Sequence, residues 1–148
     1  MKIMERKGWI LVKLLIIITG VLIFVYLITP KLQKNLYKVR DLTTQANLEY
    51  IRVAILEYYK DNTANPASLN ALVPKYLKEI PKEFLSSARG SNAVTNAKGE
   101  SSFISLRASQ LAGWIYGAYD AEKKEKFSHK VMPVSTTFSD KSGDTSSW

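Results

Sequence analysis

The sequence predicts an α+β protein in which a long amino-terminal helix, first transmembrane and then amphipathic, packs on a small antiparallel β-sheet. Three observations predict this class. An apolar run, residues 9–29, contains Lys13 as its only charged residue. No glycine or proline interrupts residues 31–62, where apolar residues recur at helical spacing. Short β-like runs follow only after residue 101.

Composition narrows the chemistry that this chain offers. Its 148 residues include 21 basic and 13 acidic side chains, a formal net charge of +8, and no cysteine. Removing the four basic residues and one acidic residue that precede Pro30 leaves 17 against 12, about +5, for the remainder. This excess is too mild to be a nucleic-acid signature by itself. Without cysteine, neither disulfides nor thiolate metal sites are available.

The apolar run has the length of a membrane span. At about 1.5 Å per residue, its 21 residues form a helix of roughly 32 Å, close to the hydrocarbon thickness of a bilayer. A helix that is apolar on every face would otherwise need a large protein around it. No A-x-A-like cleavage site follows the run, so we expect the helix to be retained. Basic residues flank both ends, and charge alone does not fix the orientation.

The residues around the start of this run resemble a known targeting signal. Arg6 and Lys7 precede Gly8, the large aromatic residue Trp9 follows, and Pro30 lies 21 positions after that aromatic. This arrangement resembles the class III signal of type IV pilins and type II secretion pseudopilins. The resemblance implies that a membrane-embedded prepilin peptidase cleaves between Gly8 and Trp9 on the cytoplasmic side.

The resemblance also implies a domain organisation and a location. Residues 1–8 would be the leader, 9–30 the transmembrane helix, 31–62 a stalk and amphipathic helix, and 63–148 a small globular pilin-like domain with a carboxy-terminal sheet. The chain would be a single-pass protein of the inner (cytoplasmic) membrane with its carboxy-terminal domain outside the cytoplasm. It could also reside in a periplasmic or surface filament.

Lys13 departs from the family pattern. Members of this family usually carry a glutamate five residues into the mature chain, where the carboxylate neutralises the terminal amine of a neighbouring subunit. A lysine there places two positive charges close together, which is repulsive in a medium of low dielectric. This departure implies a minor or accessory position, such as a filament tip. Alternatively, Lys13 lies near the membrane interface and extends its ammonium to the lipid headgroups.

Residues 31–62 predict a helix in two parts. Pro30 kinks the helix without necessarily ending it, because helix-forming residues resume at once. The later part should pack on a core, since it carries an apolar stripe at three- and four-residue spacing. That stripe consists of Leu48, Ile51, Ile55 and Tyr58 or Tyr59. The earlier part resembles a stalk, and its basic residues could contact anionic lipid headgroups or DNA, lipid being the nearer partner. These basic residues are Lys31, Lys34, Lys38 and Arg40.

The segment after this helix predicts a turn followed by a short helix. Residues 61–66 are dense in turn formers. Ser68 is an N-cap candidate for a short helix through Val73, and Pro74 closes it. The order of these elements also resembles pseudopilins. The residues that carry this second resemblance are Tyr59, Lys60, Asp61, Asn62, Pro66, Ser68, Leu69, Leu72, Tyr76, Leu77, Ile80 and Pro81.

The carboxy-terminal part predicts a loop and then a small antiparallel sheet against the later half of the long helix. The polar residues 86–101 indicate a variable loop. The alternating aromatics Trp114, Tyr116 and Tyr119 suit a sheet surface, and their Gly-Trp-x-Tyr string resembles a strand common in pseudopilins. A charged turn at 120–126 would connect two strands. The β-like runs are 102–106, 113–119, 130–134 and 136–138.

No sequence pattern predicts a catalytic or cofactor site. His129 is the only histidine, and a lone histidine beside a strand is usually a surface or edge residue. Neither a nucleophile elbow nor a glycine-rich phosphate loop occurs. Asp140 and Asp144 could offer oxygens to calcium, which major pseudopilins bind in a carboxy-terminal loop, but calcium needs about six to eight oxygen ligands. We therefore expect no enzyme activity, no cofactor and no metal.

The leading hypothesis is a pilin-like subunit, a pseudopilin or minor pilin, that assembles through its amino-terminal helix into a type II secretion or type IV pilus-type filament. Lys13 and Pro30 are the residues of this helix that we expect to matter for assembly. The resemblance implies as partners the membrane, the prepilin peptidase, other pilin-like subunits, an assembly platform protein and an ATPase. Nucleic acid is not an expected partner. Two alternatives stay open, a non-polymerising single-pass membrane protein with an extracytoplasmic partner-binding domain and a DNA-uptake pilin. The sequence does not distinguish secretion, twitching and competence machines.

Overall fold

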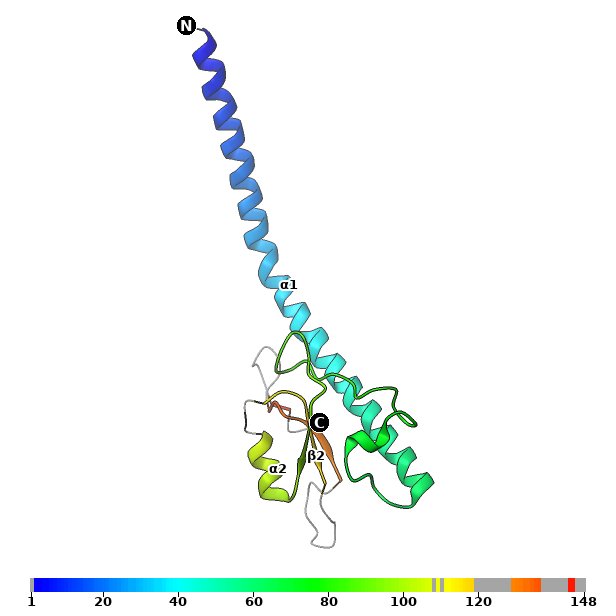
Figure 1. The fold of residues 1–148 in the computed structure, drawn as a ribbon. Helices are drawn as coiled ribbons and strands as arrows, with labels where there is room; N and C mark the ends of the chain where they lie inside the picture. Colours follow the sequence, from blue (N-terminus) through cyan, green and yellow to red (C-terminus); the bar gives the residue numbers. More distant parts are fainter. Residues whose placement is uncertain (1, 108, 110, 119–128, 137–143, 146–148) are drawn as a thin grey trace. The chain divides into compact units, whose positions relative to one another are not determined.

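The computed structural model of the chain describes residues 2–107, 109, 111–118, 129–136 and 144–145. Its long helix and small sheet confirm the predicted α+β class (Figure 1). The chain divides into two compact units, Met1–Leu36 and Tyr37–Trp148, and the second contains the sheet. The elements in order are α1 (Lys2–Asn62), the 3₁₀ helix η1 (Leu69–Leu72), β1 (Val94–Ala97), α2 (Glu100–Arg107), β2 (Trp114–Gly117) and β3 (Val131–Pro133).

Helix α1 continues through Pro30 without a break. A proline removes one helical hydrogen bond, but apolar and helix-forming residues on both sides sustain the helix. Two threonines of the apolar segment turn their hydroxyls back onto the backbone. Thr19 Oγ1 donates to Leu15 O at 2.8 Å, and Thr29 Oγ1 donates to Val25 O at 2.7 Å. These hydroxyls therefore need no polar partner from outside the helix.

Helix α1 ends where the predicted turn begins. The side chain of Asn62 donates from Nδ2 to Tyr58 O at 2.9 Å. Thr63 adopts a φ of +54° and donates its N–H to Tyr59 O at 2.8 Å. Both bonds satisfy carbonyls of the last helical turn. The short helix η1 follows with Ser68 at its N-cap position, as predicted, although the Ser68 side chain makes no capping hydrogen bond.

The sheet has three strands in the order β1-β2-β3 and is mixed. Strand β1 pairs with β2 in parallel, with Val94 opposite Trp114, whereas β2 pairs with β3 antiparallel, with Trp114 opposite Pro133. The predicted antiparallel arrangement is therefore correct for β2 and β3 and wrong for β1. The physical reason is α2, which lies between β1 and β2 in the chain and provides the crossover connection that parallel strands need.

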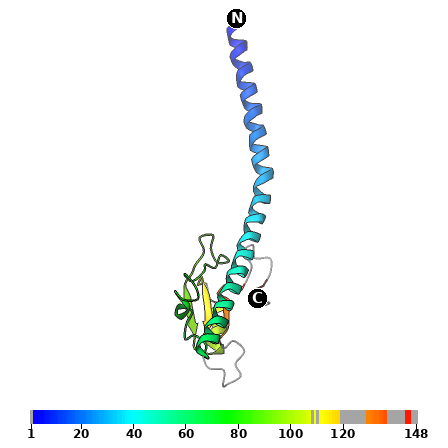
Figure 2. The same ribbon diagram turned by 90° about the vertical axis from the view of Figure 1, so that its right-hand side faces the viewer.

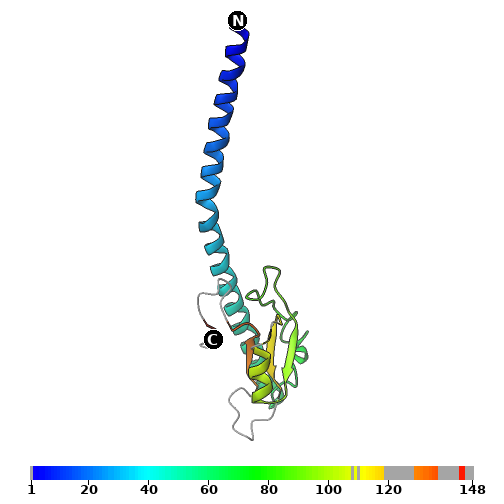
Figure 3. The same cartoon turned by 90° about the vertical axis from the view of Figure 1, so that its left-hand side faces the viewer.

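Helices cover both faces of the sheet. Figures 2 and 3 show the later half of α1 running alongside the sheet. The cluster on the α1 face contains Leu48, Ile51, Ala54, Ile55, Leu69, Leu72, Leu77, Ile80, Trp114, Tyr116 and Val131. The cluster on the α2 face contains Ala97, Phe103, Ile115, Met132 and Val134. Successive residues of a strand point to opposite faces, so β2 is buried on both. The predicted α1 stripe is confirmed, with Tyr58 packing against the core and Tyr59 exposed.

Two polar contacts fasten irregular segments to this core. Trp114 donates its indole N–H to Pro81 O at 2.7 Å. The buried Tyr116 hydroxyl donates to Pro66 O at 2.8 Å. Both bonds leave the α1 face of β2, so side chains of the central strand hold the segment before η1, at Pro66, and the segment between η1 and β1, at Pro81. Burial raises the pKa of Tyr116 above its ordinary value of 10.0, which keeps this donor protonated.

Several predictions for the carboxy-terminal part require correction. The run 102–106, predicted as a strand, lies in helix α2, where Phe103 faces the sheet and Glu100 and Arg107 occupy the helix ends that favour their charges. The predicted loop 86–101 contains strand β1. The runs 113–119 and 130–134 contain β2 and β3, as predicted. The turn 120–126 and most of the run 136–138 lie outside the described residues.

Candidate functional site

The first part of α1 carries a long exposed apolar surface. Within the described residues, one helix is long and apolar enough to cross a membrane, and its apolar window is not buried in the protein. The large apolar side chains from Trp9 to Leu27 are 48–80% exposed. Exposing apolar area to water costs roughly 25 cal/mol per Å². This surface therefore requires an apolar environment, which lipid or other apolar helices provide.

The predicted cleavage junction, Gly8 and Trp9, lies at the start of this exposed surface. Both residues are helical, and the Trp9 side chain is exposed. A Cβ atom added at Gly8 would meet nothing within 4 Å. Glycine inside a helix is destabilising by roughly 0.5–1 kcal/mol relative to alanine. Neither helix propensity nor packing against the described residues therefore explains the glycine at position 8.

Lys13 lies one helical turn beyond the junction and contacts Trp9. Its Nζ is 3.8 Å from the centroid of the Trp9 ring. The two residues are four positions apart and so share a helix face, where the ring can stabilise the ammonium by a cation–π interaction. Pro30, the other residue predicted to matter for assembly, lies inside α1 in the unit Met1–Leu36.

The part of α1 that follows Lys13, up to Arg40, contains basic residues and no acidic residue. The next charged residues along the chain are all basic, and the first carboxylate after Trp9 is that of Asp41. Three of the lysines are exposed, whereas Arg40 is half-buried and its guanidinium lies 5.5 Å from the Tyr37 ring centroid. The exposed lysines are Lys31, Lys34 and Lys38. All charged side chains between Trp9 and Arg40 are therefore positive, so a helix packed beside this stretch meets only cations.

In the second unit, α1 has apolar side chains on two faces. One face packs on the sheet, as described above. The other carries Val39, Leu42, Tyr50 and Val53, each at least half exposed. An exposed apolar row of this kind on a helix is a candidate surface for contact with another chain. The sequence analysis predicted a stalk for the earlier part of this helix and a core-facing stripe for the later part, and it did not identify this exposed row.

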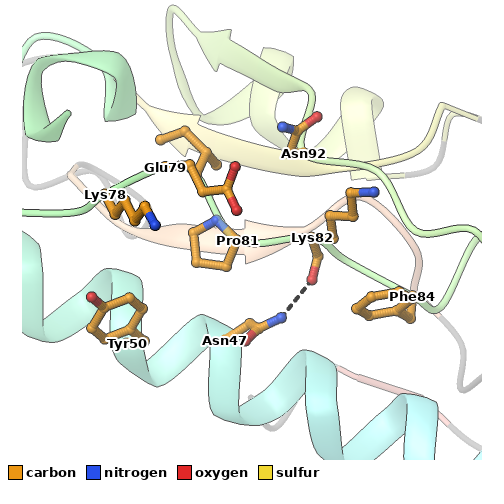
Figure 4. Close-up of a pocket in the computed structure, with 9 residues that line it drawn as sticks. Asn47, Tyr50, Lys78, Glu79, Pro81, Lys82, Phe84 and Asn92 are labelled. Atoms are coloured by element: carbon orange, nitrogen blue, oxygen red, sulfur yellow. Dashed lines mark hydrogen bonds between the residues drawn. The ribbon is translucent and has the colours of Figure 1, made fainter. Parts of the chain in front are cut away.

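An open pocket of about 410 Å³ lies between α1 and the segment that precedes β1. Figure 4 shows Asn47 and Tyr50 on the α1 wall, with Lys78 and Lys82 on the opposite wall. Asn47 Nδ2 donates to Lys82 O at 2.8 Å, a bond that holds the two walls together. The lining of the pocket includes two lysines and one glutamate but no histidine, serine or cysteine. Sequence reasoning missed it, because residues distant in sequence form it.

An exposed polar cluster joins the end of α1 to the segment after η1. Lys75 Nζ lies 2.7 Å from Asp61 Oδ2, and the Tyr76 hydroxyl donates to the same oxygen at 2.9 Å. The hydrogen bond from Lys75 lowers the pKa of Asp61, and the bond to Asp61 raises the pKa of Lys75. Asp61 and Tyr76 belong to the pseudopilin-like series of residues, and the structure brings them together. These contacts of Asp61, Lys75 and Tyr76 hold the end of α1 against the segment after η1, and we call the three residues the turn clamp.

Arg107 occupies the end of α2 and holds residues near the carboxy terminus. Its Nη2 donates to Oγ1 of the fully buried Thr145 at 2.8 Å. Thr145 donates in turn to Ser135 O at 3.0 Å. Burial lowers the pKa of Arg107, and the charge of Asp144 opposes that shift. Sequence reasoning missed this contact because it read the α2 segment as a strand.

The remaining predicted candidates do not assemble a chemical site among the described residues. His129 is half-buried beside β3, and its Nδ1 lies 3.4 Å from the Tyr116 hydroxyl. The described part of the chain contains no group of three or more histidine or carboxylate side chains that could hold a metal ion. Asp144 is exposed, and Asp140 lies outside the described residues.

Comparison with known proteins gives no assignment. The chain matches no protein-family model, no curated protein and no solved structure.

Proposed function

We propose that this chain is a pilin-like subunit, a pseudopilin or minor pilin, anchored in the inner membrane by residues 9–30 with its carboxy-terminal domain outside the cytoplasm. The observation that carries the proposal is that α1 combines an exposed apolar segment and an amphipathic segment in one helix. One continuous helix begins as an unburied apolar segment and ends as the amphipathic helix against which the sheet packs. Such a helix can be stored in a bilayer and later packed among similar helices without refolding of the domain.

The amino-terminal signal supports the processing step of this proposal. Among the described residues, a Cβ added at Gly8 would meet no atom within 4 Å, so no contact there requires the glycine, which fits a residue recognised by a peptidase. Cleavage between Gly8 and Trp9 would remove the leader and leave Trp9 as the new terminus. The mature chain would then assemble through α1 into a type II secretion or type IV pilus-type filament. An assembly platform protein and a cytoplasmic ATPase would supply the driving chemistry.

One observation favours a second candidate, a single-pass membrane protein that never polymerises. Lys13 and the basic residues after it carry no carboxylate among them, so identical helices packed side by side would repel one another. In this alternative the extracytoplasmic domain binds a partner as a single copy.

Intact-mass analysis tests the proposal. The full chain is expressed with and without a prepilin peptidase, and the mass is expected to fall by residues 1–8 only when the peptidase is present. Gly8→Val should block the change, whereas Gly20→Ala, at another helical glycine in open space, should leave it intact. If residues 1–8 remain on the chain in both expressions, the pilin proposal fails.

A further inference from the structure

We infer that Lys13 selects a different protein as the neighbour of this chain, namely a membrane helix that carries an aspartate or glutamate at the depth of Lys13. This inference rests on the proposed function and names the kind of partner that it requires. The observations behind it are the charge series of α1, the position of the Lys13 ammonium and the exposed apolar side chains around it.

The charge series excludes a copy of the same chain as the matching neighbour. Between Trp9 and Arg40 the chain has five basic residues and no acidic residue. Two parallel copies at the same depth would place Lys13 against Lys13. Ionisable groups within a membrane are found paired with one another or facing a polar cavity, because hydrocarbon does not solvate them. Between Trp9 and Arg40, a copy of this chain therefore offers no anion for such a pair.

The geometry of the helix extends the same argument beyond the apolar segment. Lys13 and Lys31 are 18 residues apart, which is about five turns of an α-helix, so they lie on the same face. Lys34 follows Lys31 at a spacing of three residues and continues that face within the unit Met1–Leu36. Repulsion between identical copies would therefore recur along the face instead of being confined to one position.

The immediate surroundings of Lys13 favour a helix as the occupant. Within the described residues Lys13 makes no ion pair. The aromatic ring that its Nζ contacts is that of Trp9. Ile10 and Ile17, three residues before and four residues after Lys13, lie on its face and are 65% and 63% exposed. A second helix covers these two side chains, and a carboxylate on that helix neutralises the ammonium between them.

Crosslinking of charge-swapped copies tests the inference with a defined partner. The chain has no cysteine, so Ile17→Cys introduces a single reactive thiol on the Lys13 face. Two differently tagged forms of the full chain are reconstituted in phosphatidylcholine vesicles and oxidised. When one tagged form keeps Lys13 and the other carries Lys13→Glu, the yield of mixed disulfide should be about tenfold higher than when both forms keep Lys13. This ratio is equivalent to about 1.4 kcal/mol. Lys98→Glu, at an exposed lysine of the second unit, is the control and should not increase the yield.

The other outcomes overturn the inference in distinguishable ways. Equal yields for every pairing would leave helix assembly, and so the proposed function, intact but would remove the role of Lys13. If phosphatidylglycerol raises the yield for Lys13 with Lys13 to that of the swapped pair, anionic lipid neutralises the lysine and no acidic helix is needed. If even the pair of Lys13→Gln with Lys13→Gln fails to crosslink, the helices do not associate and the proposed function fails as well.

Discussion

The buried carboxylate of Glu83 accepts a hydrogen bond of 3.1 Å from the backbone N–H of Gly113, the residue that precedes β2. The same carboxylate accepts bonds from the N–H and the hydroxyl of Ser86, at 2.8 and 3.0 Å. The Glu83 side chain is fully buried, and none of the ion pairs among the described residues includes it. Three donors therefore replace the water that a carboxylate normally needs.

Glu83→Gln should lower the free energy of unfolding by about 1–3 kcal/mol, because an amide nitrogen cannot accept a bond from a buried donor. Urea unfolding of the full chain in detergent, followed by circular dichroism, measures the loss. Glu79→Gln makes the same chemical change at an exposed residue and should stay within about 0.5 kcal/mol of the parent chain. Equal losses in the two variants would contradict the assigned role of Glu83.

Gly113→Ala should destabilise the junction of β1 and β2. Gly113 has a φ of +116°, and a Cβ there would lie 2.3 Å from Ala93 O, the oxygen that accepts the Trp114 N–H at 2.8 Å. Strained backbone of this kind costs about 1–3 kcal/mol before the clash is added. Hydrogen exchange at the Trp114 amide should accelerate in this variant. In Gly99→Ala, where the added Cβ meets no atom within 4 Å, that amide should exchange at the parental rate.

The turn clamp of Asp61 and Lys75 should stabilise the fold at neutral pH and lose its effect in acid. The pKa of Asp61 lies below its ordinary value of 3.8 in the folded chain. The stabilisation is therefore fully present above that ordinary value and disappears as the pH falls through the lowered pKa. The difference in unfolding midpoint between the parent and Lys75→Met, measured from pH 7 downward, should shrink as Asp61 is protonated, leaving only the contact of Lys75 with Tyr76. Lys78→Met, at another exposed lysine, should show no such pH-dependent difference.

A charge in the middle of the apolar segment should impair membrane insertion. Ile18→Arg places a guanidinium near the centre of the span, where insertion is unfavourable by about 2.5–3.5 kcal/mol. More of the chain should then be extracted by alkaline carbonate than for the parent. Val53→Arg adds the same group to the exposed face of α1 in the second unit and should remain in the membrane fraction. Equal extraction of both variants would mean that residues 9–29 do not anchor the chain.

The long helix and the central strands could be predicted because their signals are local. Leu48, Ile51 and Ile55 repeat at helical spacing and are buried, as that spacing predicts. Trp114 and Tyr116 alternate, and both point to the α1 face of β2. Local periodicity determined these elements, so one sequence was sufficient to locate them.

The failures arose where short segments carry two compatible patterns. In residues 100–107, Phe103 and Leu106 are three apart, as on a helix face, but the mixed apolar and serine content also suits a strand. The helix is selected by tertiary packing, since Phe103 fills the second face of the sheet. The parallel pairing of β1 and the burial of Glu83 likewise depend on residues far apart in the chain. The Trp9 and Lys13 contact was within reach of sequence reasoning, because residues four apart on a helix are neighbours.

Because β2 packs against α1 on one face and α2 on the other, a force applied to α1 within the second unit is transmitted to the sheet. A pull along α1 within the second unit reaches the sheet through the packing of Leu48 and Ile51 in the same cluster as Trp114 and Tyr116. These aromatic residues also bond to the Pro66 and Pro81 carbonyls, so the load is shared with the segments on both sides of η1.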